Sequence, residues 1–219
     1  MNPRGTGLRP RLVETYRRQV RRILLVLVAV ALGMGLSAPA HAVVNGVPST
    51  PGTFGFLVAL LDTGRLNGQG AFQSQFCGGS LTTPTTVVTA AHCVVDQQSG
   101  AHDLPASVVV GFGRSLKDPA IRTAAVSAIT VHPNYSIANG ENDVAVLTLT
   151  TPVTDIQTIT PLKAADLSSL ETPGNKVSVA GWGSLNSFGN TFPDAFRVGD
   201  LVLLPAATCG QGQNTAVNG

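Results

Sequence analysis

Two residues of the 219-residue sequence have side chains that could move a proton together, His92 and Asp143. A serine hydroxyl is a poor nucleophile, so it needs an imidazole to accept its proton and a carboxylate to orient that imidazole and stabilise its charged form. His92 ends an apolar segment, and Asp143 follows Asn142 directly before the apolar run Val144–Leu149. The two residues are therefore a candidate general base and its orienting carboxylate.

Each candidate also has a purely structural interpretation. An isolated histidine is more often structural than catalytic, and an Asn-Asp pair routinely makes a turn before a strand. The other histidines are weaker candidates, since His41 lies near the N-terminus, His102 in a polar loop and His132 before a proline. No spacing of His, Cys and carboxylate residues is typical of a zinc site, so the sequence predicts no metal and no cofactor.

The residues around the two candidates resemble the chymotrypsin/trypsin family of serine proteases (peptidase S1), in its secreted bacterial type. Val88–Cys93, with Cys77 upstream, is similar to the family's histidine segment, and Asn142–Leu147 is similar to its aspartate segment. The chain order His, Asp, Ser is that of this family. The resemblance implies that His92 and Asp143 are catalytic and that protein or peptide substrates are hydrolysed through an acyl-enzyme.

The serine that this chemistry needs is not recognisable in the sequence. No Gly-Asp-Ser-Gly-Gly segment follows Cys209, Ser80 lies before His92 in an expected strand, and Asp200 is followed by Leu201. We therefore expect a C-terminally truncated trypsin-like endopeptidase, inactive as given, without an oxyanion hole or a readable specificity pocket. The alternative is a non-catalytic homologue that acts as a secreted binding module.

The resemblance implies an all-β fold of two antiparallel six-stranded β-barrels, the second incomplete. Composition agrees, because 24 glycines, 14 prolines and only 12% charged residues suit many short strands better than a helical bundle. Residues 43–150 are expected to form the first barrel with both candidates, residues 151–174 a connector, and residues 175–219 part of the second barrel. Trp182, between two glycines, is assigned a structural role. The expected strands are 54–61, 77–81, 85–89, 107–111, 124–131, 144–149, 176–180 and 198–204.

Residues 1–42 have the three parts of a secretory signal peptide. Half of the 14 basic residues lie there, followed by the apolar run Ile23–Leu36 and the small-x-small segment Ala40–Ala42. A membrane anchor is the alternative, but this run is shorter than the roughly 20 residues that span a bilayer. We expect a secreted, extracellular protein without a stable membrane anchor; the general secretory and twin-arginine routes both stay open.

Cleavage after Ala42 would make Val43 the mature N-terminus, which resembles the start of the mature family proteases. In the family the new ammonium group pairs with an aspartate beside the catalytic serine; alternatively, Val43 merely begins an edge strand. Without the leader the chain has more acidic than basic residues, so the basic isoelectric point does not indicate nucleic-acid binding. The oligomeric state cannot be predicted.

Three cysteines in an exported chain favour disulfide formation. Cys77 and Cys93 are the obvious pair, because a bridge between them closes a short loop, contributes about 3 kcal/mol to stability and holds His92 in place. Cys209 is then either a free thiol or the partner of a cysteine outside the printed sequence, and we expect the second.

Overall fold

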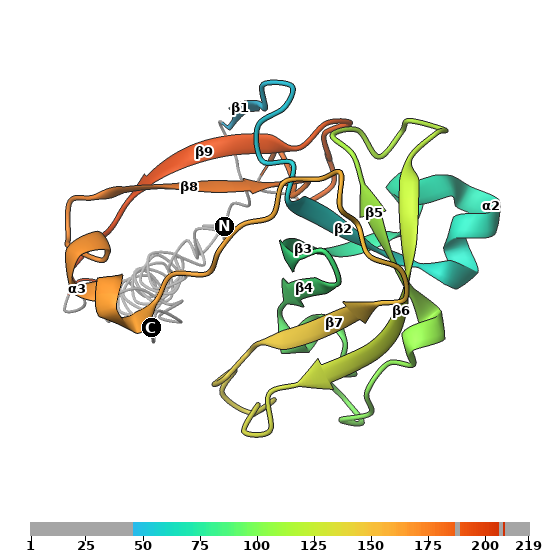
Figure 1. The fold of residues 1–219 in the computed structure, drawn as a ribbon, viewed down its shortest axis with the longest axis horizontal. Coiled ribbons are helices and arrows are strands. Elements are labelled where there is room, and N and C mark those ends of the chain that lie inside the picture. Colours follow the sequence, from blue (N-terminus) through green and yellow to red (C-terminus); the bar gives the residue numbers. More distant parts are fainter. Residues whose placement is uncertain (1–45, 187–188, 206–207, 209–219) are drawn as a thin grey trace, which may run out of the picture. The chain divides into compact units, whose positions relative to one another are not determined.

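A computed structural model describes residues 46–186, 189–205 and 208 of the chain (Figure 1). The chain divides into two compact units, Met1–Ala38 and Pro39–Gly219, and every described residue belongs to the second. The expected signal peptide, Val43 and Cys209 lie outside the described residues. Among the residues that are described, no helix combines the length and the apolar character needed to cross a membrane.

Six antiparallel strands form a closed barrel in the order β2-β3-β4-β7-β6-β5. The barrel closes because β2 pairs with β3 on one side and with β5 on the other. Two single 3-10 turns, Ala91–Cys93 and Pro105–Ser107, lie in its connections. The strands are β2 (Leu57–Asp62), β3 (Gln75–Thr83), β4 (Thr86–Thr89), β5 (Val108–Phe112), β6 (Arg122–Val131) and β7 (Ala145–Leu149).

The barrel is filled by apolar side chains that point inward from every strand. β-Branched and aliphatic residues favour strands because they pack well on a pleated surface, and alternate residues of a barrel strand face the interior. In β4 and β7 buried positions alternate with more exposed ones. Leu60, Leu81, Val87, Val110 and Leu147 are fully buried in this core. The expected strands therefore match the observed ones to within a few residues at each end.

A second sheet has three antiparallel strands in the order β1-β9-β8. They are β1 (Val47–Pro48), β9 (Arg197–Val202) and β8 (Lys176–Gly181). In Figure 1 β8 and β9 run side by side as the two long orange and red arrows. Trp182, directly after β8, is 3% exposed, donates its indole N–H to the backbone carbonyl of Arg114 and packs edge-on against Phe196. Trp182 therefore has the structural role that the sequence indicated.

A helix lies between the first two expected strands, where the sequence analysis predicted none. The helix α2 (Thr63–Ser74) begins directly after β2, and its N-cap Asp62 accepts a hydrogen bond from the backbone N–H of Arg65 at 2.8 Å. Gly70, at φ 73°, breaks the helix into two parts, because this left-handed conformation suits glycine. A 3-10 turn, Ala164–Asp166, and the four-residue helix α3, Leu167–Leu170, lie in the expected connector.

Candidate active site

His92 lies on the single 3-10 turn that directly follows β4. Ala91, the first residue of the turn, and Val94, the residue after it, are fully buried in the barrel core. The backbone N–H groups of Cys93 and Val94 close the turn by donating to the carbonyls of Ala90 and Ala91. Because the turn is anchored by its buried residues, it presents the imidazole of His92 outward, with 55% of the side chain exposed.

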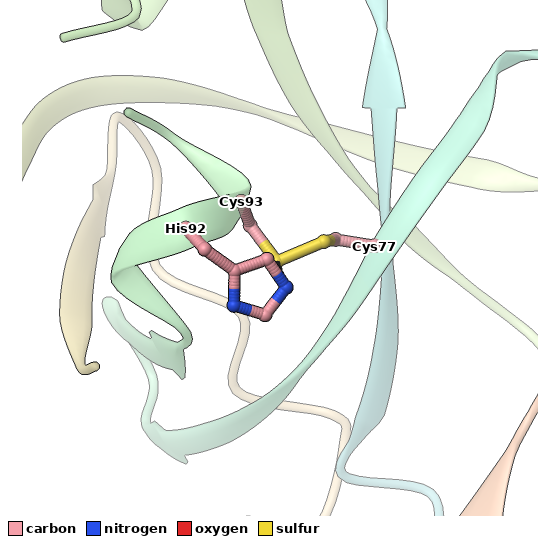
Figure 2. A group of neighbouring side chains, drawn as sticks. All are labelled: Cys77, His92 and Cys93. Carbon is pink, nitrogen blue, oxygen red and sulfur yellow. Dashed lines mark hydrogen bonds between the residues drawn. A yellow bond between two sulfur atoms is a disulfide. The ribbon is translucent and has the colours of Figure 1, made fainter. Parts of the chain in front are cut away.

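A disulfide joins Cys93 of this turn to Cys77 of β3, with 6.1 Å between the two Cα atoms (Figure 2). The imidazole of His92 lies beside the bridge, its Nε2 atom 3.6 Å from the Sγ atom of Cys93. A half-cystine sulfur has no proton to donate, so this contact leaves the lone pair of Nε2 available. The two sulfur atoms and the imidazole are close enough together to suggest a metal site. Cysteine binds a metal as its thiolate, however, and both sulfur atoms here are bonded to each other in the disulfide.

Asp143 comes from the loop that leads into β7, and strand pairing brings it to His92. β4 and β7 are antiparallel neighbours in which Thr89 pairs with Ala145. The end of one strand therefore lies beside the start of the other, and residues that are 51 positions apart meet. The preceding residue, Asn142, has a φ of 56°, and its side-chain amide donates to the carbonyl of Asn134 at 3.0 Å. This conformation is tolerated by asparagine better than by most residues, and it directs the chain just before Asp143.

Both carboxylate oxygens of Asp143 bind His92. Oδ1 accepts the backbone N–H of His92 at 2.8 Å, and Oδ2 lies 2.7 Å from Nδ1 of the imidazole. An ionised carboxylate only accepts hydrogen bonds, so the proton of the neutral imidazole resides on Nδ1 and the lone pair on Nε2. The carboxylate thus fixes both the tautomer and the orientation of the ring.

The pKa of Asp143 is lowered from its ordinary value of 3.8. Partial burial is the largest single influence and opposes ionisation, but it is outweighed by the hydrogen bonds from the ring and the backbone of His92, by the charge of that ring and by the N–H of Ala91. The carboxyl group is therefore ionised at neutral pH. Its side chain remains 32% exposed, so water competes for the same oxygens.

The two segments that superficially match a nucleophile segment, around Ser80 and around Asp200, lie outside the turn that carries His92. Ser80 is in β3, paired with Leu57 and Val88, and no hydrogen bond within the described part of the chain joins it to His92. Asp200 is in β9, where it accepts a hydrogen bond from the hydroxyl of Ser178. Neither supplies a hydroxyl to His92.

The remaining histidines of the described residues have structural contacts. His132 accepts the backbone N–H of Asn134 on its Nδ1 at 3.2 Å, and His102 forms an isolated β-bridge with Val95. Sequence analysis did not single out Gln97, whose side-chain amide faces the backbone carbonyls of His92, in the turn, and of Val95, two residues after the turn. A glutamine in a polar loop has no motif that would indicate such a contact.

A hollow of about 350 Å³ opens on the disulfide side of the site. Its walls come from residues 77–80 of β3 and from residues 180–183 around Trp182, together with Leu57 and Gln75. Four of these lining residues are glycines, and glycine backbone permits a close approach of another chain segment. The hollow therefore lies between β3 of the barrel, which carries Cys77, and the end of β8 in the second sheet.

Comparison with known proteins connects this geometry to a family. The sequence model of the family described as Trypsin matches residues 43–219. A trypsin of Saccharopolyspora erythraea is 40% identical over 116 residues, which are 52% of this chain and 47% of that protein. Trypsin-3 of Salmo salar is 30% identical over 146 residues, 64% of this chain and 56% of that protein. Transmembrane protease serine 11G of Mus musculus is 32% identical over 135 residues, 62% of this chain and 31% of that protein.

The aligned regions therefore span about half or less than half of the length of most of these relatives. The family match, in contrast, covers residues 43–219, including the turn after β4, the disulfide and the loop before β7. The chain belongs to the trypsin family, that is, to the chymotrypsin/trypsin-like serine proteases.

Proposed function

We propose that this protein is a secreted serine endopeptidase of trypsin type in which His92 is the general base and Asp143 the orienting carboxylate. The observation that carries the proposal is the double hydrogen bond from His92 to the two oxygens of Asp143, which leaves Nε2 with a lone pair. Protein or peptide substrates would be hydrolysed through an acyl-enzyme, without a metal or a cofactor.

The proposed chemistry uses the ring as a proton carrier. Nε2 accepts the proton of a hydroxyl nucleophile as that oxygen attacks the peptide carbonyl, and the imidazolium is stabilised by the adjacent carboxylate of Asp143. The same proton then goes from Nε2 to the leaving amine. A water molecule repeats the sequence on the acyl-enzyme, with Nε2 again as the base.

We further propose that residues 43–219 alone do not hydrolyse peptides. The 219-residue sequence contains no Gly-Asp-Ser-Gly-Gly segment, so neither the hydroxyl nor the neighbouring oxyanion-hole amides are supplied. On this proposal β8 and β9 belong to a second barrel that is incomplete in residues 175–219, and β1, although it lies within residues 43–150, pairs with β9 of that barrel. Residues 43–150 are the first barrel and residues 151–174 the connector.

Export is the remaining part of the proposal. Residues 1–42 act as a signal peptide that is removed after Ala42, and Val43 becomes the mature N-terminus. The support is the apolar run and the small-x-small segment of the sequence, together with a family match that begins at residue 43. The mature protein then acts outside the cell without a stable membrane anchor.

The deciding experiment restores the missing group. The chain is extended with a C-terminal segment of the trypsin family that carries Gly-Asp-Ser-Gly-Gly, and labelling by a serine-directed fluorophosphonate is measured. We expect the extended chain to be labelled, the unextended chain to remain unlabelled, and His92→Ala to abolish labelling of the extended chain. His102→Ala is the matched control, because His102 is exposed and, among the described residues, has no hydrogen bond to His92 or Asp143.

Two results would refute the proposal. One is labelling of the extended chain that survives His92→Ala. The other is a folded extended chain that is never labelled, which would favour the non-catalytic binding module. Folding of each variant is checked by its circular dichroism and its thermal transition.

A further inference from the structure

The side-chain amide of Gln97 touches both loops of the site. Its Nε2 atom donates to the carbonyl of Val95 at 2.6 Å and lies 3.5 Å from the carbonyl of His92, at the long limit of a hydrogen bond. Its Oε1 atom accepts the hydroxyl of Tyr135 at 3.1 Å. An amide has two N–H donors and a carbonyl acceptor, so one group can make all three contacts.

The chemistry of the partners fixes how this amide is turned. Backbone carbonyls only accept hydrogen bonds, so the NH₂ group of Gln97 must face Val95 and His92. The carbonyl oxygen of the amide is then directed at Tyr135, whose hydroxyl is the donor. A carboxylate at position 97 would lose both N–H donors.

Tyr135 belongs to the loop that carries Asp143. Its backbone N–H donates to the carbonyl of His132 at 3.0 Å, and its ring packs against the barrel core. The residue before it, Asn134, accepts the side-chain amide of Asn142, which directly precedes Asp143. Tyr135 is therefore connected to the backbone at Asn142, directly before Asp143, through its neighbour Asn134 and one hydrogen bond.

These contacts form a closed circuit. One side is the direct pair of hydrogen bonds between His92 and Asp143. The other side runs from the carbonyl of His92 through the side chains of Gln97 and Tyr135, along the backbone to Asn134, and through the amide of Asn142 to the residue before Asp143. The direct pair is open to solvent, since the side chain of His92 is 55% exposed and that of Asp143 is 32% exposed. Hydrogen bonds that water can compete for are weak constraints, and the bond between Tyr135 and Gln97 is exposed as well, so two connections between the loops constrain them more than the direct pair alone.

We propose that Gln97 and Tyr135 are positioning residues that hold the turn of His92 in register with the loop of Asp143. The proposal rests on the proposed function, because it concerns the same proton-transferring pair. Neither residue touches the reacting atoms: Gln97 acts on the backbone of the turn, and Tyr135 acts through Gln97. The pairing of β4 with β7 brings the two loops together, and the link from Tyr135 to Gln97 sets how tightly they stay together.

The test measures hydrogen–deuterium exchange of the backbone amide of His92 in the full chain, because this N–H donates directly to Asp143. The variants are Tyr135→Phe, which keeps the ring in the core, Gln97→Ala, and the two combined. We expect exchange at His92 to be about 3- to 10-fold faster in each single variant, which corresponds to the loss of one ordinary hydrogen bond. Amides of β2 and β5 in the barrel should keep their wild-type rates.

The double variant tests whether Tyr135 acts through Gln97. If it does, Tyr135→Phe has no further effect once Gln97 is alanine, so the double variant exchanges like Gln97→Ala. Ser99→Ala is the matched control, since it removes a 2.6 Å hydrogen bond to Asp96 in the same loop and leaves the Gln97 contacts intact. Exchange at His92 should be unchanged in this control.

Three outcomes overturn the proposal: unchanged exchange at His92 in both single variants, an equal acceleration throughout the barrel, or additive effects in the double variant. The exchange measurement needs no nucleophile, whereas the proposed function is tested by fluorophosphonate labelling. Labelling that fails while the exchange result holds refutes the protease proposal and leaves the circuit standing. The reverse result refutes only the circuit.

Discussion

Replacing Asp143 by asparagine should move the proton of the His92 ring to the wrong nitrogen. In the native site the two carboxylate oxygens accept the backbone N–H at 2.8 Å and the ring Nδ1–H at 2.7 Å. Asparagine has one acceptor oxygen and one NH₂ donor. The backbone N–H cannot change its role, so the oxygen must face it and the NH₂ group must face Nδ1. Nδ1 then accepts, and the ring proton resides on Nε2.

The size of this effect follows from the alternative arrangement. If the asparagine oxygen faced the ring instead, its NH₂ group would oppose the backbone N–H, and an unsatisfied donor pair costs about 1–3 kcal/mol. The Nε2–H tautomer should therefore exceed the Nδ1–H tautomer by about 5- to 150-fold. Only one of the two native hydrogen bonds is kept, with an uncharged acceptor, so the partly exposed site should lose about 1 kcal/mol of unfolding free energy.

The loss of stability should depend on pH in a defined direction. The folded-state pKa of Asp143 lies below its ordinary value of 3.8, so the unfolded chain binds this proton more tightly than the folded chain. The stabilisation by the carboxylate is therefore fully present above the ordinary pKa and is lost as the pH falls through the lower folded pKa. The difference in unfolding free energy between wild type and Asp143→Asn should shrink over that acidic range.

The assay is ¹⁵N NMR of the imidazole at about pH 9, where an ordinary histidine is neutral. In the wild type the Nδ1 resonance of His92 should have the chemical shift of a protonated nitrogen. In Asp143→Asn the Nε2 resonance should have that shift instead. Asp155→Asn is the matched control: its pKa is also lowered, by a side-chain hydrogen bond from Arg122, but it does not touch His92. A variant that keeps the Nδ1–H tautomer would refute the assigned hydrogen-bond roles.

The remaining predictions concern the barrel, the disulfide and the mature terminus. Gly79→Ala should cost about 1–3 kcal/mol of unfolding free energy, because the added Cβ would lie 2.8 Å from a side-chain carbon and 2.9 Å from a backbone oxygen of β4. Gly78→Ala is its control, since its Cβ would lie 3.5 Å from the nearest atom, and equal urea midpoints for the two variants would contradict the argument. Replacing Cys77 and Cys93 together by serine should lower stability by about 3 kcal/mol for a sequence separation of 16, seen as a lower melting temperature, whereas an unchanged transition would show that the bridge is dispensable. Terminal sequencing of the secreted protein should find Val43 first, and a start well downstream of it would refute the proposed cleavage.

Short strands were predictable from the sequence because their signal is local. The run 85–89 was expected to be a strand, and β4 occupies Thr86–Thr89 with alternate burial. The same holds for β7, expected at 144–149 and found at Ala145–Leu149. Apolar β-branched residues between turn signals carry this information within five or six positions.

The helix α2 was not predicted because its glycines conceal it. Gly64, Gly68 and Gly70 each lower helix propensity, and the segment begins with residues that are typical of a turn. Its N-cap contact, from the side chain of Asp62 to the backbone N–H of Arg65, is a signal that the sequence contained. Tertiary packing of the buried Ala71 against Ala59 and Leu61 of β2 overrides the weak propensity.

The meeting of His92 with Asp143 could be inferred from family resemblance but not from local pattern. Its cause is the pairing of Thr89 with Ala145, a non-local contact that no window of the sequence contains. The circuit through Gln97 and Tyr135 was out of reach for the same reason, because each residue is unremarkable until the two loops lie together. Family resemblance identifies His92 and Asp143, whereas the contacts of Gln97 and Tyr135 depend on how this chain's own loops fold.

The pairing of β1 with β9 sets the order in which this protein can fold. Val47 pairs with Val198, and the guanidinium of Arg197 donates to the carbonyl of Gly46, 151 positions away. All barrel strands lie between residues 57 and 149, so the barrel can form from contacts of shorter sequence separation while β9 is not yet available. We therefore expect β1 to pair with β9 only late in folding, because this pairing closes a very long loop. If the chain is exported N-terminus first, β1 would have no partner strand until residues 197–202 had crossed the membrane.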